Sequence, residues 1–127
     1  MRKLLTGFSA AAFIVTIAAP AFAATETVTG KLVDRGCYTK DMANNADNDH
    51  KMPADVAACA VACAKRGLPM ALLTTDGKVY TIEGGLAADN NAKLVAHMGH
   101  TVEITGDVVT KDGAETITAA DLKMISQ

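Results

Sequence analysis

All three cysteines of this 127-residue chain lie within one stretch, and a histidine lies between them. The four residues are Cys37, His50, Cys59 and Cys63. Three thiolates and one imidazole form a standard tetrahedral ligand set for Zn²⁺, and soft thiolates also suit Cu(I). The spacing matches no zinc-finger class. The prediction of a metal site therefore depends on the residue types more than on their spacing.

The same cysteines are also typical of a structural disulfide. Cysteines of exported proteins usually pair, but three cannot all pair within one chain. In a helix, two residues at the i, i+4 spacing of Cys59 and Cys63 have Cβ atoms about 5–6 Å apart, whereas a disulfide needs about 3.5–4.5 Å. A disulfide would therefore join Cys37 to Cys59 or to Cys63. A third alternative is that Cys59 and Cys63 pack as small core residues.

A thiol-dependent redox protein is a further alternative. The chain contains no C-x-x-C redox motif, and it contains no C-x-x-C-H haem motif because Ala64 follows Cys63. A thiolate–imidazole pair would need Cys37 or Cys63 beside His50, but no feature of the sequence orients the histidine. The sequence therefore favours a non-enzymatic protein with no catalytic residues.

A second, weaker cluster consists of His97, Met98 and His100. Two imidazoles and a thioether near a turn are ligands that suit copper or nickel. The alternative is that Met98 packs in the core and that the histidines lie at a helix end, where a cation interacts favourably with the helix dipole.

The start of the chain resembles an export signal in its composition. Two basic residues precede a long apolar run, which ends in an A-x-A pattern at residues 21–23. This order is typical of a cleaved signal peptide. Residues 1–23 are therefore predicted to be removed, and residues 24–127 are predicted to form a single periplasmic or secreted domain.

The charge of the chain limits its partners. The formal net charge is −2, and loss of Arg2 and Lys3 with the signal peptide would make it −4. The chain has no Trp and two Tyr. An acidic protein with few aromatic residues lacks the basic footprint and stacking surfaces that nucleic acids need. It also lacks the basic residues that bind an anionic membrane surface. We expect no nucleic-acid or membrane partner, and the sequence does not identify a protein partner.

Alternating apolar and polar residues predict a mainly β protein. The predicted strands cover residues 27–33, 70–75, 78–82, 101–109 and 113–125. Asp76-Gly77 between two apolar runs is a strong hairpin signal. Asn90 or Asn91 is predicted to cap a short helix that runs through His97.

A longer helix is predicted over residues 53–66. Pro53 suits the first helical position, and Gly67 suits the C-cap. The face with i, i+3, i+4 and i+7 spacing is predicted to pack inward. That face consists of Val56, Cys59, Ala60 and Cys63.

Five strands with a helix between the third and the fourth have the order of an OB-fold, a small five-stranded barrel. The cysteine helix would then be an insertion after the first strand. Gly30 and Gly106 are predicted to mark the sharp bends that such a small barrel needs. An α+β sheet with two helices on one face is the structural alternative.

Several motifs resemble those of small, exported, largely uncharacterised bacterial proteins with OB-like barrels. The motifs are TGKLVD at residues 29–34 with Cys37 after it, the C-x-x-x-C helix that ends in Gly67-Leu68-Pro69, DGKVY at 76–80, and TVEITG at 101–106. The resemblance covers most of the predicted mature chain. It implies an OB-like fold and an exported location, and it implies no activity.

Together these observations predict an exported, non-enzymatic domain whose Cys/His site binds a soft metal, Cu or Zn. The alternative is a structural or interaction module of the cell envelope that a disulfide from Cys37 stabilises.

Overall fold

The computed structural model describes residues 23–44 and 54–127, and strands are the main regular structure among them. The strands are β1 (Ala24–Asp34), β2 (Met70–Leu73), β3 (Val79–Glu83), β4 (Thr101–Lys111), β5 (Ala114–Thr118) and β6 (Leu122–Ser126). The α-helices are α1 (Arg35–Lys40), α2 (Ala54–Lys65) and α3 (Ala88–Asn91), and the 3₁₀ helices are η1 (Met42–Asn44), η2 (Gly84–Ala87) and η3 (Val95–His97).

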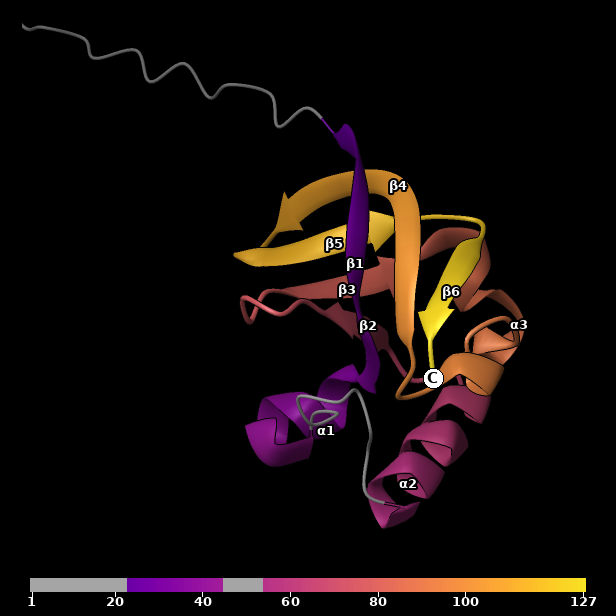
Figure 1. Ribbon diagram of the computed structural model, residues 1–127. Coiled ribbons are helices and arrows are strands. Elements are labelled where there is room, and N and C mark those ends of the chain that lie inside the picture. Colours follow the sequence, from indigo (N-terminus) through magenta and orange to yellow (C-terminus); the bar gives the residue numbers. More distant parts are fainter. Residues whose placement is uncertain (1–22, 45–53) are drawn as a thin grey trace, which may run out of the picture.

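Five of the strands close into a mixed barrel (Figure 1). Going round the barrel, the order is β1, β2, β3, β5 and β4, and β4 pairs again with β1. The pair β3–β5 is parallel, and the other pairs are antiparallel. Strand β6 lies outside this closed set and pairs with β4. The predicted small OB-like barrel is therefore confirmed, and the α+β sheet was the wrong alternative.

Both predicted glycine positions lie where two strands approach closely. A Cβ atom added to Gly30 would lie 2.6 Å from the carbonyl oxygen of Leu73. One added to Gly106 would collide with the carbonyl oxygen of Thr118. Since no larger residue fits against these carbonyls, the two glycines allow β1 and β4 to follow the tight curve of the barrel.

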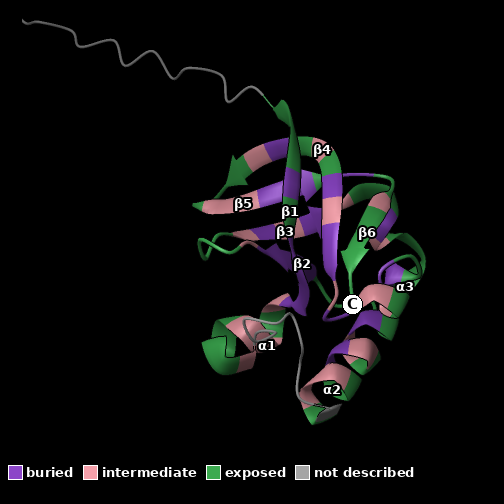
Figure 2. Cartoon of the chain, viewed as in Figure 1, coloured by how far each residue is buried: buried purple, intermediate pink, exposed green. Residues whose placement is uncertain are grey.

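The buried stretches of the chain lie mainly on the barrel strands (Figure 2). The described residues form two buried apolar clusters. The main one includes Leu32, Leu72, Ile82, Leu86, Leu94, Val102, Ile104 and Ile117, with Ala60 and Ala64 from α2. The smaller one consists of Val33, Ala71 and Leu73, against which Tyr38 and Val79 pack. Successive residues of a strand point to opposite faces. The ends of β1 and β2 are therefore covered on both sides, which explains why Met70–Leu73 is a continuous apolar run.

The chain after β4 differs from the sequence prediction. The last strand was predicted to run without interruption from residue 113 to 125, but it is two strands, β5 and β6. Ala119 lies between them, donates a hydrogen bond to Glu83 O and accepts one from Leu86 N. These bonds draw the chain away from the sheet toward η2, and the chain then pairs with β4 again as β6, further along the same edge that pairs with β5.

The short helix predicted through His97 is also different. Asp89, Asn90 and Asn91 all have positive φ angles, between 52° and 57°, which interrupts the helix. The segment is divided between α3 and η3, and neither asparagine caps it. Asn and Asp adopt the left-handed region more readily than other non-glycine residues, so this run favours a reversal over a regular helix.

Helices α1 and α2 lie at the same end of the barrel, where β1 ends and β2 begins (Figure 1). Within residues 23–44 and 54–127, no helix has the length and apolar character needed to cross a membrane.

Candidate metal centre

Cys37 is positioned by the junction between β1 and α1. Asp34 is the last residue of β1 and the N-cap of α1, and its Oδ1 accepts a hydrogen bond of 2.9 Å from the backbone N of Cys37. Aspartate is a favoured N-cap residue because its side chain satisfies an amide that has no partner within the helix. The sequence analysis ended the first strand here and did not predict α1. Asp34 followed by Lys40 in the last turn was the available signal, and Gly36 weakened it.

Cys59 and Cys63 are positioned by α2, and the end of this helix is fixed by two backbone hydrogen bonds. Leu68 N donates to Cys63 O at 3.2 Å, and Gly67 N donates to Ala64 O at 2.9 Å. With Gly67 at φ +77°, this is a Schellman motif. The predicted C-cap at Gly67 is confirmed, and it fixes the last turn of α2, where Cys63 lies.

Asn91 attaches this end of α2 to the barrel. Its side chain is buried, and its Nδ2 donates hydrogen bonds of 2.9 Å to both Ala64 O and Leu68 O. The last carbonyls of a helix lack the usual partners of the helical hydrogen-bond pattern, and a carbonyl oxygen can accept two hydrogen bonds. An amide from another segment can therefore bind the end of α2. The sequence analysis missed this role because it treated Asn91 as a cap of its own segment.

The three thiols converge. The Sγ atoms of Cys37, Cys59 and Cys63 all lie within 4.8 Å of one another. In a tetrahedral zinc site with Zn–S bonds of about 2.3 Å the sulfur atoms are about 3.8 Å apart, so a shift of about 1 Å would suffice to bind the ion. Three of the four predicted metal ligands therefore lie together, although Cys37 comes from a different helix than the other two.

The predicted disulfide is wrong for this structure. Cys37, Cys59 and Cys63 are all free thiols, so Cys37 is bonded to neither Cys59 nor Cys63. The reason lies in the geometry: the three sulfur atoms surround one point, and no pair has the bonded approach of about 2.05 Å. The interpretation of an inward-facing Cys59 is also wrong, because Cys59 is exposed, whereas Ala60 and Ala64 form the buried face of α2.

The carboxyl group of Asp34 and burial both raise the pKa values of two of the thiols, Cys37 and Cys63. A hydrogen bond with Asp34 and burial raise the pKa of Cys63 to about 12, and the negative charges of Asp34 and Cys59 act in the same direction. Burial, followed by the charge of Asp34, raises the pKa of Cys37. The Oδ2 atom of Asp34 is buried and has no hydrogen bond of standard geometry. In the metal-free centre, Cys37 and Cys63 therefore hold their protons more tightly than an ordinary cysteine does.

A small cavity opens onto two of these thiols. Its volume is about 190 Å³, and it lies between α1 and the first turns of α2. Its lining includes Asp34, Cys37, Asn44, Asp55 and Cys59. An ion bound by the thiols is thus accessible from one side, where oxygen ligands are available.

The remaining predicted ligands are His50 and the second cluster, which consists of His97, Met98 and His100. His50 lies outside the described residues, so its role as a ligand stays a prediction. His97 and His100 contact each other edge to face, with ring centroids 5.9 Å apart. Met98 belongs to the barrel core. Among the His, Cys, Asp and Glu side chains of residues 23–44 and 54–127, the three cysteines form a group that could hold a metal ion. Metal binding by His97, Met98 and His100 stays a prediction.

Comparisons of the chain with protein-family models, with curated proteins and with solved structures found no match.

Proposed function

We propose that this chain is an exported protein that binds one thiophilic metal ion, Cu(I) or Zn²⁺, through Cys37, Cys59 and Cys63. The observation that carries the proposal is the convergence of the three sulfur atoms within 4.8 Å. Thiolates are the ligands that these ions prefer among protein side chains. The proposed function is binding of the metal, without a chemical reaction.

The surroundings of the thiols support a metal over simple packing of cysteines. Core cysteines are usually fully buried, but Cys59 is exposed and Cys37 and Cys63 are half-buried. Asp34 adds a carboxylate to the three thiols, and Asp55 lines the adjoining cavity. A bound cation would offset the negative charge that accumulates when the thiols lose their protons.

The two metals differ in what they require beyond three thiolates. Structural zinc is almost always four-coordinate, so Zn²⁺ would need a further ligand such as His50, a carboxylate or water. Cu(I) is softer and is well served by thiolates alone. The cavity beside Cys37 and Cys59 provides space for a fourth ligand, so the geometry is compatible with both ions.

Export to the periplasm or the medium is part of the proposal. It is supported by the signal-like composition of residues 1–23 and by the resemblance to exported proteins with OB-like barrels. In such a compartment, free thiols are prone to oxidation, and a bound metal would protect them.

Native mass spectrometry of the reduced protein, loaded separately with Cu(I) and with Zn²⁺, tests the proposal. We expect one metal equivalent on the wild-type chain and none on the variant with all three cysteines changed to serine. The variant His97→Ala/His100→Ala is the matched control, because it removes two potential ligands and leaves the thiols intact. It should retain the full equivalent.

Two results would overturn the proposal. One is a wild-type chain that takes up neither metal under reducing conditions. The other is a triple-serine variant that binds as much metal as the wild type.

A further inference from the structure

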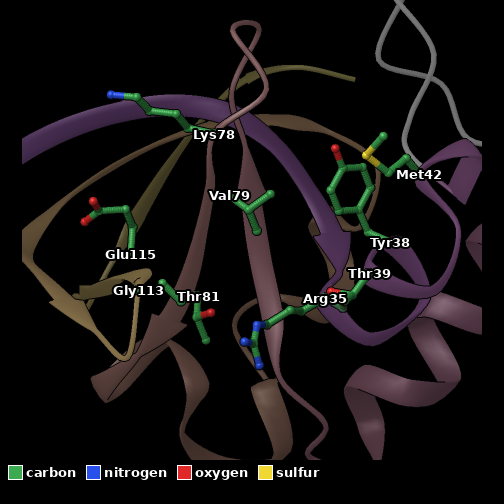
Figure 3. Close-up of a pocket in the computed structure, with 10 residues that line it drawn as sticks. Arg35, Tyr38, Thr39, Met42, Lys78, Val79, Thr81, Gly113 and Glu115 are labelled. Atoms are coloured by element: carbon green, nitrogen blue, oxygen red, sulfur yellow. The ribbon is translucent and has the colours of Figure 1, made fainter.

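A second and larger cavity lies on the outer side of the barrel, and the proposed metal site does not use it. Its volume is about 520 Å³, within the range of about 300–1,000 Å³ that is typical of small-molecule sites. Helix α1 and η1 form one wall, β3 forms the floor, and the β4–β5 turn forms the other wall (Figure 3).

Helix α1 separates this cavity from the thiols. Arg35, Tyr38 and Thr39 line the cavity, and their i, i+3 and i+4 spacing places them on one face of the helix. Cys37 lies on the opposite side of α1 and lines the smaller cavity. The two cavities are therefore distinct sites that share a helix.

Val79 on the floor, with Tyr38 and Met42 on the helical wall, gives the cavity an apolar surface. Val79 and Tyr38 both pack against the small outer cluster that contains Leu73, and Val79 lies between Tyr38 and Thr81 in Figure 3. The ring of Tyr38 is half-buried, with Met42 beside it. This surface offers contact area to a flat apolar group, because an aromatic ring loses little conformational freedom when a ligand covers it.

The charged groups around the cavity are not equivalent. Glu115 accepts a hydrogen bond from Thr110. Lys78 lies near Asp76, whose pKa is lowered mainly by the hydrogen bond from Thr74 and to a smaller extent by the charge of Lys78. Arg35 has no ion pair and no side-chain hydrogen bond with any described residue. Its guanidinium extends from α1 across the cavity toward the strand that carries Thr81 (Figure 3). Its guanidinium is therefore available to pair with a ligand.

We propose that this cavity binds a small organic anion with an aromatic or apolar body, and that Arg35 pairs with its acidic group. A guanidinium binds a carboxylate or sulfonate through two parallel hydrogen bonds, which fixes the orientation of the ligand. The body of the ligand covers Tyr38 and Val79. Lys78 supplies a second positive charge at the far end of the cavity.

Two fluorescent probes that differ only in the acid test this proposal. 8-Anilinonaphthalene-1-sulfonate carries a sulfonate, and N-phenyl-1-naphthylamine has the same rings without it. We expect Arg35→Gln to weaken binding of the sulfonate by about tenfold or more, because a charge-assisted hydrogen bond is lost. The same variant should leave the affinity for the neutral probe unchanged.

Lys65→Gln is the matched control, because Lys65 is an exposed cation at the end of α2 and does not line the cavity. It should bind both probes as the wild type does. In the wild-type chain, sulfonate-induced changes in amide NMR shifts should centre on Gly113, Ala114 and Thr81. This measurement depends on no variant.

The proposal is overturned if Arg35→Gln leaves sulfonate binding unchanged or weakens both probes equally. It is also overturned if Lys65→Gln weakens sulfonate binding as much as Arg35→Gln does, because the attraction would then be a general charge effect. Shift changes that centre on other strands would overturn it as well.

Discussion

The Oδ1 atom of Asp34 accepts a 2.9 Å hydrogen bond from the backbone N of Cys37, and the same carboxyl group raises the pKa values of Cys37 and Cys63. One buried side chain thus begins α1 and also sets the proton affinity of the thiols. The position of Cys37 and the chemistry of the centre therefore depend on the same residue.

The two roles of Asp34 can be separated by substitution. Asn is as good an N-cap as Asp but carries no charge, whereas Ala provides no cap. We expect Asp34→Asn to keep α1 and to lower the pKa of Cys63, and Asp34→Ala to lower the free energy of unfolding by about 1 kcal/mol more. In a background with Cys37 and Cys59 changed to serine, each unit by which the pKa of Cys63 falls should speed its alkylation at pH 8 by about threefold.

Alkylation kinetics with iodoacetamide and urea unfolding measure these two effects. If Asp34→Asn leaves the alkylation rate of Cys63 unchanged in that background, the carboxylate does not hold the thiol proton. Equal stability of the Asn and Ala variants would show that the cap contributes nothing.

The barrel was predictable because its signals are local. The alternation of apolar and polar residues predicted the strands, and Asp76-Gly77 predicted the hairpin. Gly30 and Gly106 predicted where the barrel strands bend. The two misassigned segments depend on contacts between distant residues. Ala119 leaves the sheet because Glu83 and Leu86 bond to it, and Asn91 bonds to the end of α2. Neither partner can be inferred from a pattern within ten or so residues.

The candidate site was predictable in its residues but not in its arrangement. With three cysteines, any single disulfide leaves one thiol free, and this odd number was the reason to consider a metal site as well. The number alone could not show that Cys37 meets both helix cysteines, because that depends on α1, a six-residue helix that contains a glycine. The cavity beside Arg35 left no signal in the sequence, since it is formed by three segments that are distant along the chain.

The raised pKa of Cys63 predicts a pH dependence of the metal-free protein. The pKa is about 12 in the folded chain and 9.0 for an ordinary cysteine, so the folded state holds this proton more tightly. The stabilisation is fully present below about pH 9 and is lost as the pH rises toward 12. We expect the urea midpoint of the reduced, metal-free chain to fall between about pH 8.5 and 10.5 more steeply than that of Cys63→Ser.

Serine is the suitable replacement because its hydroxyl can still donate to Asp34 but does not titrate in this range. The difference between the two slopes isolates Cys63 from the lysines and tyrosines, which titrate in both chains. Identical slopes would contradict the raised pKa.

Asn91 should matter for both stability and metal affinity, although it is not a ligand. Leu68 lies just after the C-terminal end of α2, and removal of the Asn91 side chain leaves the carbonyl oxygen of Leu68 without this donor. The loss should lower the free energy of unfolding by about 1–3 kcal/mol. Asn91 also has φ +57°, so Asn91→Ala adds backbone strain that Asn91→Gly avoids. We expect both variants to be destabilised, Ala more than Gly.

Thermal unfolding measures the stability, and competition with a chelator measures the metal affinity. We expect Asn91→Gly to weaken metal binding, because the last turn of α2 carries Cys63. Asp89→Gly is the matched control, since Asp89 is an exposed neighbour with a similar φ of 52°. An Asn91→Gly variant with unchanged affinity would mean that Cys63 does not need this attachment.

Metal removal should loosen α1 more than any strand of the barrel. Helix α1 has no buried residues, so its cap, the packing of Tyr38 and the thiols account for most of its attachment. A metal ion would join Cys37 on α1 to two cysteines on α2 and would stabilise the folded chain by mass action. We expect hydrogen exchange of the Asp41 amide, which donates to Cys37 O at 3.0 Å, to be at least about tenfold faster in the metal-free chain.

Amides in the centre of β4 provide the internal reference, because they exchange only through larger openings of the barrel. Their rates should change less than that of Asp41 when the metal is removed. In Cys37→Ser, which lacks the ligand on α1, the Asp41 amide should exchange fast with and without metal. If Cys37→Ser instead showed the same metal-dependent protection as the wild type, α1 would not be held through its thiol, and the ion would be bound by α2 alone.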